Sequence, residues 1–71
     1  MAKLPRVSGA EVIRALQRLG FEKILQNGSH VVMRRGSSGC VVPLHSEVKV
    51  GTLAGVLRQA GVNGDEFTGA L

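Results

Sequence analysis

The sequence contains no tryptophan and no tyrosine, and its only aromatic side chains are two phenylalanines. A chain of 71 residues buries only about 60% of the surface that it exposes when unfolded. The core must therefore consist mainly of valine, leucine and isoleucine, which leaves little volume for an enclosed cavity. We expect a single domain over residues 1–71, without a cofactor and without a buried small-molecule site.

Cysteine is almost absent as well. Cys40 is the only one, so the chain cannot form an intramolecular disulfide, and no metal-ligand spacing surrounds it. We expect a buried thiol there rather than a reactive one. No apolar run approaches the ~20 residues needed to span a bilayer, and the N-terminal residues lack the apolar region of a signal peptide. These absences predict a cytoplasmic protein with no membrane contact and no bound metal.

Negative charge is scarce. Nine lysines and arginines against five acidic residues give a formal net charge of +4. All nine basic residues lie between Lys3 and Arg58, whereas Asp65 and Glu66 are in the C-terminal tail. A small basic domain attracts polyanions, and nucleic acid is the leading candidate. The alternative is that the charge serves solubility alone.

The clearest helix signal begins at Ser8. Ser8 and Glu11 have the spacing of a capping box, and Gly20 predicts the end of the helix. Between them, apolar residues recur at helical spacing. The predicted apolar face consists of Val12, Ile13, Leu16 and Leu19.

Three short segments with strand character follow, at Phe21–Gln26, His30–Arg35 and Cys40–Leu44. Asn27-Gly28 predicts a hairpin between the first two, with both residues as turn positions of positive φ. Pro43 cannot donate to a ladder, so the third strand ends there or lies at an edge.

Strand alternation predicts which side chains share a face. In the first strand, Phe21 and Leu25 are expected on one side. In the second strand, His30 and Arg34 share a face, and Arg35 points to the other one.

A second helix is predicted from Lys49 to Ala60, with Gly61 as its stop. Gly51 lies in its first turn, where the lack of a side chain would allow a ligand to approach the backbone closely. Asn63–Phe67 predicts a short last helical turn. The apolar face of the second helix consists of Val50, Leu53, Val56, Leu57 and Ala60.

The predicted order is helix, three-stranded antiparallel meander, helix. We expect an α+β fold of αβββα order, with both helices on one face of the sheet and a short C-terminal helical turn. This layout is similar to that of double-stranded-RNA-binding domains, which by itself says little about activity.

Six short motifs occur in a characteristic order along nearly the whole chain. They are Leu19-Gly20-Phe21, Gly28-Ser29-His30, Val42-Pro43-Leu44-His45, Gly51-Thr52-Leu53, Leu57-Arg58-Gln59-Ala60-Gly61 and Asp65-Glu66-Phe67. In this order and spacing, the sequence resembles the HicA-type toxins, also called YcfA-like. These toxins are small mRNA interferases of bacterial toxin–antitoxin pairs.

The resemblance implies a double-stranded-RNA-binding-like fold, cleavage of mRNA without a metal, and a HicB-type antitoxin as partner. It also implies that His30, in the Gly-Ser-His motif, is the essential histidine. Family members often carry an aromatic residue further along this strand, whereas this chain has Val31, Val32 and Met33. That difference removes a surface on which a base could stack.

Cleavage of RNA without a metal requires a base for the 2′-hydroxyl proton, an acid for the 5′-oxygen and a cation for the phosphate. Histidine suits both proton transfers. We expect His30 to act as acid or base and Arg34 to help hold the phosphate. His45 is a second candidate, with a plain connector role as its alternative. From spacing alone, His30 is more simply explained as a polar residue that closes a hairpin. The resemblance reverses that order.

The start of the second helix offers a phosphate site. Gly51 and Thr52 expose backbone N–H groups there, and Lys49 adds charge. The Ser29 hydroxyl either donates to a phosphate or stabilises the turn. The leading hypothesis is therefore an endoribonuclease toxin. The alternatives are a non-catalytic RNA-binding module and a protein-interaction domain that docks an acidic partner.

Overall fold

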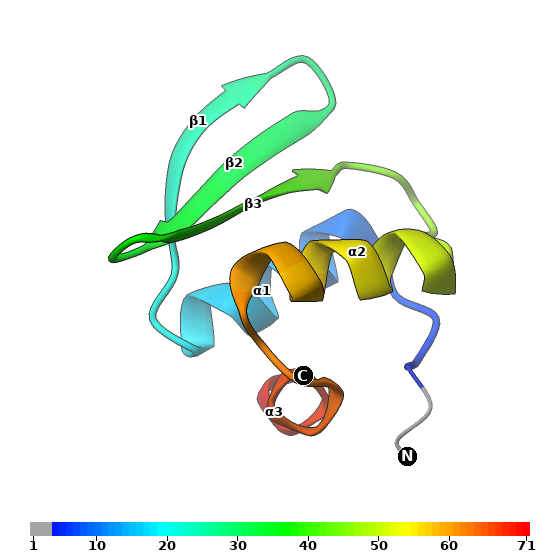
Figure 1. The fold of residues 1–71 in the computed structure, drawn as a ribbon. Coiled ribbons are helices and arrows are strands. Elements are labelled where there is room, and N and C mark those ends of the chain that lie inside the picture. The colour runs from blue at the N-terminus through cyan, green and yellow to red at the C-terminus, as the bar shows by residue number, and fades with distance from the viewer. Residues whose placement is uncertain (1–3) are drawn as a thin grey trace.

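The computed structural model describes residues 4–71, which form an α+β fold with a three-stranded antiparallel sheet (Figure 1). The order of elements confirms the predicted αβββα arrangement, and the expected C-terminal turn is a helix of seven residues. The elements are α1 (Gly9–Arg18), β1 (Glu22–Asn27), β2 (His30–Arg35), β3 (Ser38–Pro43), α2 (Val50–Ala60) and α3 (Gly64–Ala70).

Helix α1 begins at the predicted capping box. The Glu11 backbone N–H donates to the Ser8 hydroxyl at 3.2 Å, and the Glu11 carboxylate accepts from the Ser8 backbone N–H at 3.0 Å. These hydrogen bonds hold the pKa of the Glu11 carboxyl below its usual value, with a smaller contribution from the charge of Arg14. The chain leaves the helix through Gly20, whose φ of 95° favours glycine.

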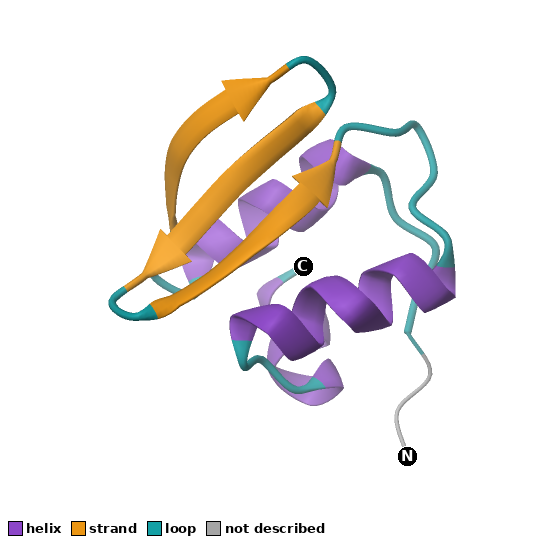
Figure 2. Cartoon of the chain, turned by 45° about the horizontal axis from the view of Figure 1, so that its top comes forward, coloured by secondary structure: helices purple, strands orange, loops and turns teal. Residues whose placement is uncertain are grey.

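The sheet has the order β1-β2-β3, and α1 and α2 lie against one of its faces, as predicted (Figure 2). The alternation of β2 and β3 points Val31, Met33 and Val42 into the core, where none of them is exposed. His30, Val32 and Arg34 point to the opposite face, which no helix covers. We call this surface the open face.

Strand β1 differs from its prediction. None of its six residues is buried, and the register with β2 shifts between Lys23 and Leu25. Phe21 precedes the strand and is 3% exposed, whereas Leu25 is 52% exposed. The expectation that these two side chains share a side is therefore wrong, because the irregularity adds one residue to the alternation.

Helix α2 starts at Val50, with Lys49 as an N-cap that makes no side-chain capping bond. The predicted apolar positions are buried with one exception. Val50 is 48% exposed, because the first turn of α2 extends past the end of β3 (Figure 1). Gly61 ends the helix in the left-handed region, with a φ of 72°.

Helix α3 closes the core from below in the view of Figure 1. It begins with a second capping box, formed by Asn63 and Glu66, and it buries Phe67 completely. Arg18 of α1 donates to the carbonyl oxygen of Ala70 at 2.8 Å and so ties the last turn of α3 to α1. No helix within residues 4–71 is long and apolar enough to cross a membrane.

Candidate active site at the hairpin end of the sheet

His30 is the first residue of β2, directly after the hairpin turn. The two central turn residues are Gly28 and Ser29, while Asn27 is the last residue of β1 and pairs with His30. Gly28 has a φ of 62°, and no residue other than glycine in the described range 4–71 has a positive φ. The hairpin was predicted, but the turn lies one residue further along than the Asn27-Gly28 signal indicated.

The ends of β2 and β3 meet beside this turn. His30 pairs with Pro43 across the two strands, and the Leu44 backbone N–H donates to the Ser29 carbonyl oxygen at 2.6 Å. The hairpin end is therefore fastened to the segment that follows β3. This contact brings the residue pairs Ser29-His30 and Leu44-His45 together.

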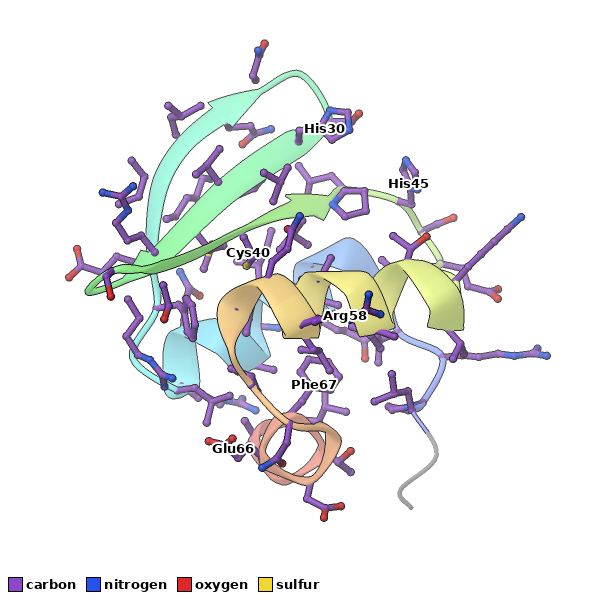
Figure 3. All side chains as sticks on the ribbon, in the orientation of Figure 1. His30, Cys40, His45, Arg58, Glu66 and Phe67 are labelled. Atoms are coloured by element: carbon purple, nitrogen blue, oxygen red, sulfur yellow. The ribbon has the colours of Figure 1, made fainter. Side chains whose placement is uncertain are left out.

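His45 lies two residues beyond Pro43 and is exposed, as His30 is. Figure 3 shows both imidazoles projecting outward at the same end of the molecule. The His45 carbonyl oxygen accepts a hydrogen bond of 2.9 Å from the backbone N–H of Gly9, at the start of α1. The backbone of His45 is thus fixed, while its ring is free to meet a ligand.

The first turn of α2 follows His45 after a short connector. Lys49, Gly51 and Thr52 are all exposed there. A methyl group added at Gly51 would meet no other atom within 4 Å, so packing within residues 4–71 does not require glycine. The predicted phosphate site is accessible to a ligand, and its role stays a prediction.

Arg34 is exposed on the open face together with His30, but it lies near the other end of β2. Four residues separate the two positions, which corresponds to about 13 Å along a strand. The cross-strand partners of Arg34 are Glu22 and Gly39. The structure therefore does not bring Arg34 to the hairpin end.

Two other arginines have structural roles. Arg35 donates to the Leu19 carbonyl oxygen at 2.8 Å, and its guanidinium lies 4.7 Å from the centre of the Phe21 ring. Arg18 holds the end of α3, as described above. The sequence places Arg35 on the other face of its strand from His30, but it predicts neither of these contacts, because both join residues far apart in the chain.

Cys40 is buried, as predicted, with 4% of its surface exposed. Burial raises the pKa of its thiol, which lowers the amount of nucleophilic thiolate. In residues 4–71 no group of three or more histidine, cysteine or acidic side chains is placed to hold a metal ion.

Sequence reasoning missed two features near the histidines. One is the contact of Gly9 with the segment after β3. The other is a row of apolar side chains across the open face, formed by the cross-strand partners Leu25, Val32 and Val41. The adjacent valines at 31–32 and 41–42 were a signal for this row, because neighbouring strand residues point to opposite faces.

The family model described as the HicA toxin of bacterial toxin–antitoxin systems matches residues 9–62. The chain belongs to the HicA toxin family. The matched part of this HicA chain runs from the start of α1 to just beyond α2 and includes both histidines and the start of α2. A comparison with curated proteins found no match. The chain is thus a toxin of a toxin–antitoxin pair, and a HicA toxin implies a cognate antitoxin.

Proposed function

We propose that this HicA chain is an endoribonuclease that cleaves mRNA without a metal and is inhibited by a HicB-type antitoxin. The observation that carries the proposal is the pair of exposed histidines, His30 and His45, at the neighbouring ends of two strands. The family makes the chain a toxin, and two imidazoles supply the proton transfers that RNA cleavage needs.

In the proposed reaction, the ribose 2′-hydroxyl attacks the adjacent phosphorus while the bond from phosphorus to the 5′-oxygen breaks. His30 accepts the proton of the 2′-hydroxyl, and His45 donates a proton to the departing 5′-oxygen, or the two exchange these roles. The products are a 2′,3′-cyclic phosphate on one fragment and a 5′-hydroxyl on the other.

The negative charge on the reacting phosphate needs stabilisation as it grows. We assign this to the backbone N–H groups of Gly51 and Thr52, at the positive end of α2, together with the ammonium group of Lys49. The Ser29 hydroxyl lies next to His30 and is available to donate to the same phosphate. Arg34 is too far along β2 for this role, so we assign it to a neighbouring phosphate of the bound RNA.

The antitoxin is expected to cover His30 and so exclude the substrate. The apolar row crosses the open face at Val32, two residues from His30, and offers a partner protein a nonpolar contact surface there. Leu25 and Val41 are 52% and 41% exposed there. The same row has no aromatic ring on which a base could stack.

The test is incubation of the purified protein with labelled single-stranded RNA in EDTA. We expect cleavage that leaves a 2′,3′-cyclic phosphate on one fragment and a 5′-hydroxyl on the other. The His30→Ala variant should lose about 10²–10⁴-fold in rate while still binding RNA, because only a proton carrier is removed. Asn27→Ala is the matched control, since Asn27 is the exposed cross-strand partner of His30 on β1.

Equal cleavage by the wild-type protein and His30→Ala would refute the assignment. Binding of RNA without cleavage by the wild-type protein would favour the RNA-binding module instead. The absence of RNA binding at low salt would leave the protein-interaction domain, with an acidic partner as its ligand.

A further inference from the structure

We infer that Gly9 is a positioning residue for the two histidines, because it seats the start of α1 directly on the segment that carries His45. This inference rests on the proposed function. Gly9 is the first residue of α1. It has no side chain to place in the core, yet its backbone is buried.

The approach of the two backbones at Gly9 leaves no room for a side chain. A methyl group added there would overlap the carbonyl oxygen of Pro43 and would lie 2.9 Å from the Cα atom of Leu44. Both are backbone atoms, so neither can rotate out of the way. Any larger residue must therefore move either α1 or the segment 43–45.

Hydrogen bonds hold the same segment on two sides. On one side, the Gly9 N–H donates to the His45 carbonyl oxygen at 2.9 Å; three residues further along, the Val48 N–H donates to the Val7 carbonyl oxygen at 2.7 Å and ties the following connector to the residues before α1. On the other side, Leu44 donates to the Ser29 carbonyl oxygen. The segment thus links α1 to the hairpin turn, so a shift at Gly9 changes the position of His45 relative to His30.

Other glycines of the chain do not share this property. A methyl group at Gly55, in the middle of α2, would meet nothing within 4 Å. Gly55→Ala is therefore the matched control for Gly9→Ala: the same atom is added to a helical glycine, but away from the histidines.

The first experiment compares the kinetics of RNA cleavage at saturating substrate. Gly9→Ala should lower kcat by about 10–100-fold, as a misplacement of about 1 Å does, while KM changes little. Gly55→Ala should leave kcat unchanged. The decisive measurement is the double variant. If Gly9 acts through His45, then adding Gly9→Ala to His45→Ala should cause no further loss of kcat.

Gly9→Ala carries a risk of misfolding, so a second change removes the hydrogen bond without adding a side chain. Replacing the Gly9 amide by an ester exchanges only the N–H for oxygen. The 71-residue chain can be assembled chemically from residues 1–39 and 40–71, because ligation at Cys40 joins the two peptides. The ester should keep a cooperative unfolding transition, shift the NMR signals of the His45 ring, and lower kcat only when His45 is present.

The outcomes separate the inference from the function on which it rests. If the wild-type protein does not cleave RNA, or His30→Ala cleaves normally, the proposed function fails and the inference fails with it. If cleavage depends on His30 but the Gly9 and His45 effects on kcat multiply independently, only the inference is wrong. An ester variant with unchanged kcat would overturn it as well.

Discussion

At the scale of single residues, hydrogen bonds distinguish two arginines with structural roles from a third, and the sequence alone does not predict the distinction. Arg18 and Arg35 each donate to a backbone carbonyl oxygen from another part of the chain, whereas Arg34 is exposed on the open face. Adjacent arginines in β2 therefore have different roles. Strand alternation predicts that Arg34 and Arg35 point to opposite faces, but it does not predict that Arg35 packs on the Phe21 ring.

This difference predicts opposite outcomes for two neighbouring substitutions. Arg35→Ala should lower the free energy of unfolding by about 2 kcal/mol, because it removes a charged hydrogen bond and a cation–π contact. Arg34→Ala should change stability by less than about 0.5 kcal/mol and weaken RNA binding instead. Urea unfolding and RNA titration of both variants check this. Equal loss of stability would contradict the roles assigned here.

At the scale of elements, local signals account for most of the helices and strands. Capping boxes and left-handed glycines fix the starts of α1 and α3 and the end of α2, since each depends on residues within one turn. Other features of the fold depend on contacts between residues far apart in the sequence. The irregularity in β1 and the contact of Gly9 with the segment after β3 both depend on residues far away in sequence, so no local pattern predicts them.

The same limit applies to the candidate site. His30, His45 and the start of α2 were all identified from the sequence, and their exposure agrees with a binding role. Arg34 was grouped with His30 because alternation gives the face of a strand. Arg34 nevertheless lies four residues further along β2 than His30, so the two side chains are not at the same end of the strand. Gly9 has no side chain and contacts the segment 43–45 through its backbone, so its residue type gives no chemical signal in the sequence.

The start of α1 gives an element-scale prediction. Ser8→Ala should destabilise the protein by about 1 kcal/mol at neutral pH, because it removes the side-chain half of the capping box. The lowered pKa of Glu11 means that its contribution is present above the ordinary carboxyl value and is lost as the pH falls through the lower, folded-state value.

The stability difference between wild type and Ser8→Ala should therefore shrink as the pH falls through the lowered pKa of Glu11, because the carboxyl is then protonated in both proteins. Unfolding curves at several pH values measure it. Ser37→Ala, at an exposed turn, is the control. A difference that stays constant down to acid pH would contradict the coupling of Ser8 and Glu11.

At the scale of the whole molecule, one face of the sheet carries the core and no helix covers the other. With only two phenylalanines, the core depends heavily on each large side chain. Phe67 is completely buried and comes from α3, which lies outside the family-matched range 9–62. In this chain the last helix thus completes a core that the matched residues begin.

Phe67→Ala should cost about 3–5 kcal/mol, which is a large part of the total stability of a small domain. Phe67→Leu should cost less, because it leaves a smaller cavity. Thermal unfolding of the two variants provides the comparison. If Phe67→Ala melts within a few degrees of the wild-type protein, α3 is dispensable for the core.

The irregular register of β1 has a further consequence for the free protein. An exposed edge strand offers unpaired N–H and C=O groups to any other chain, and β1 also carries exposed Ile24 and Leu25. The shift between Lys23 and Leu25 interrupts the straight ladder that a second copy would need in order to extend the sheet. The shift therefore disfavours pairing of β1 with the same strand of a second copy.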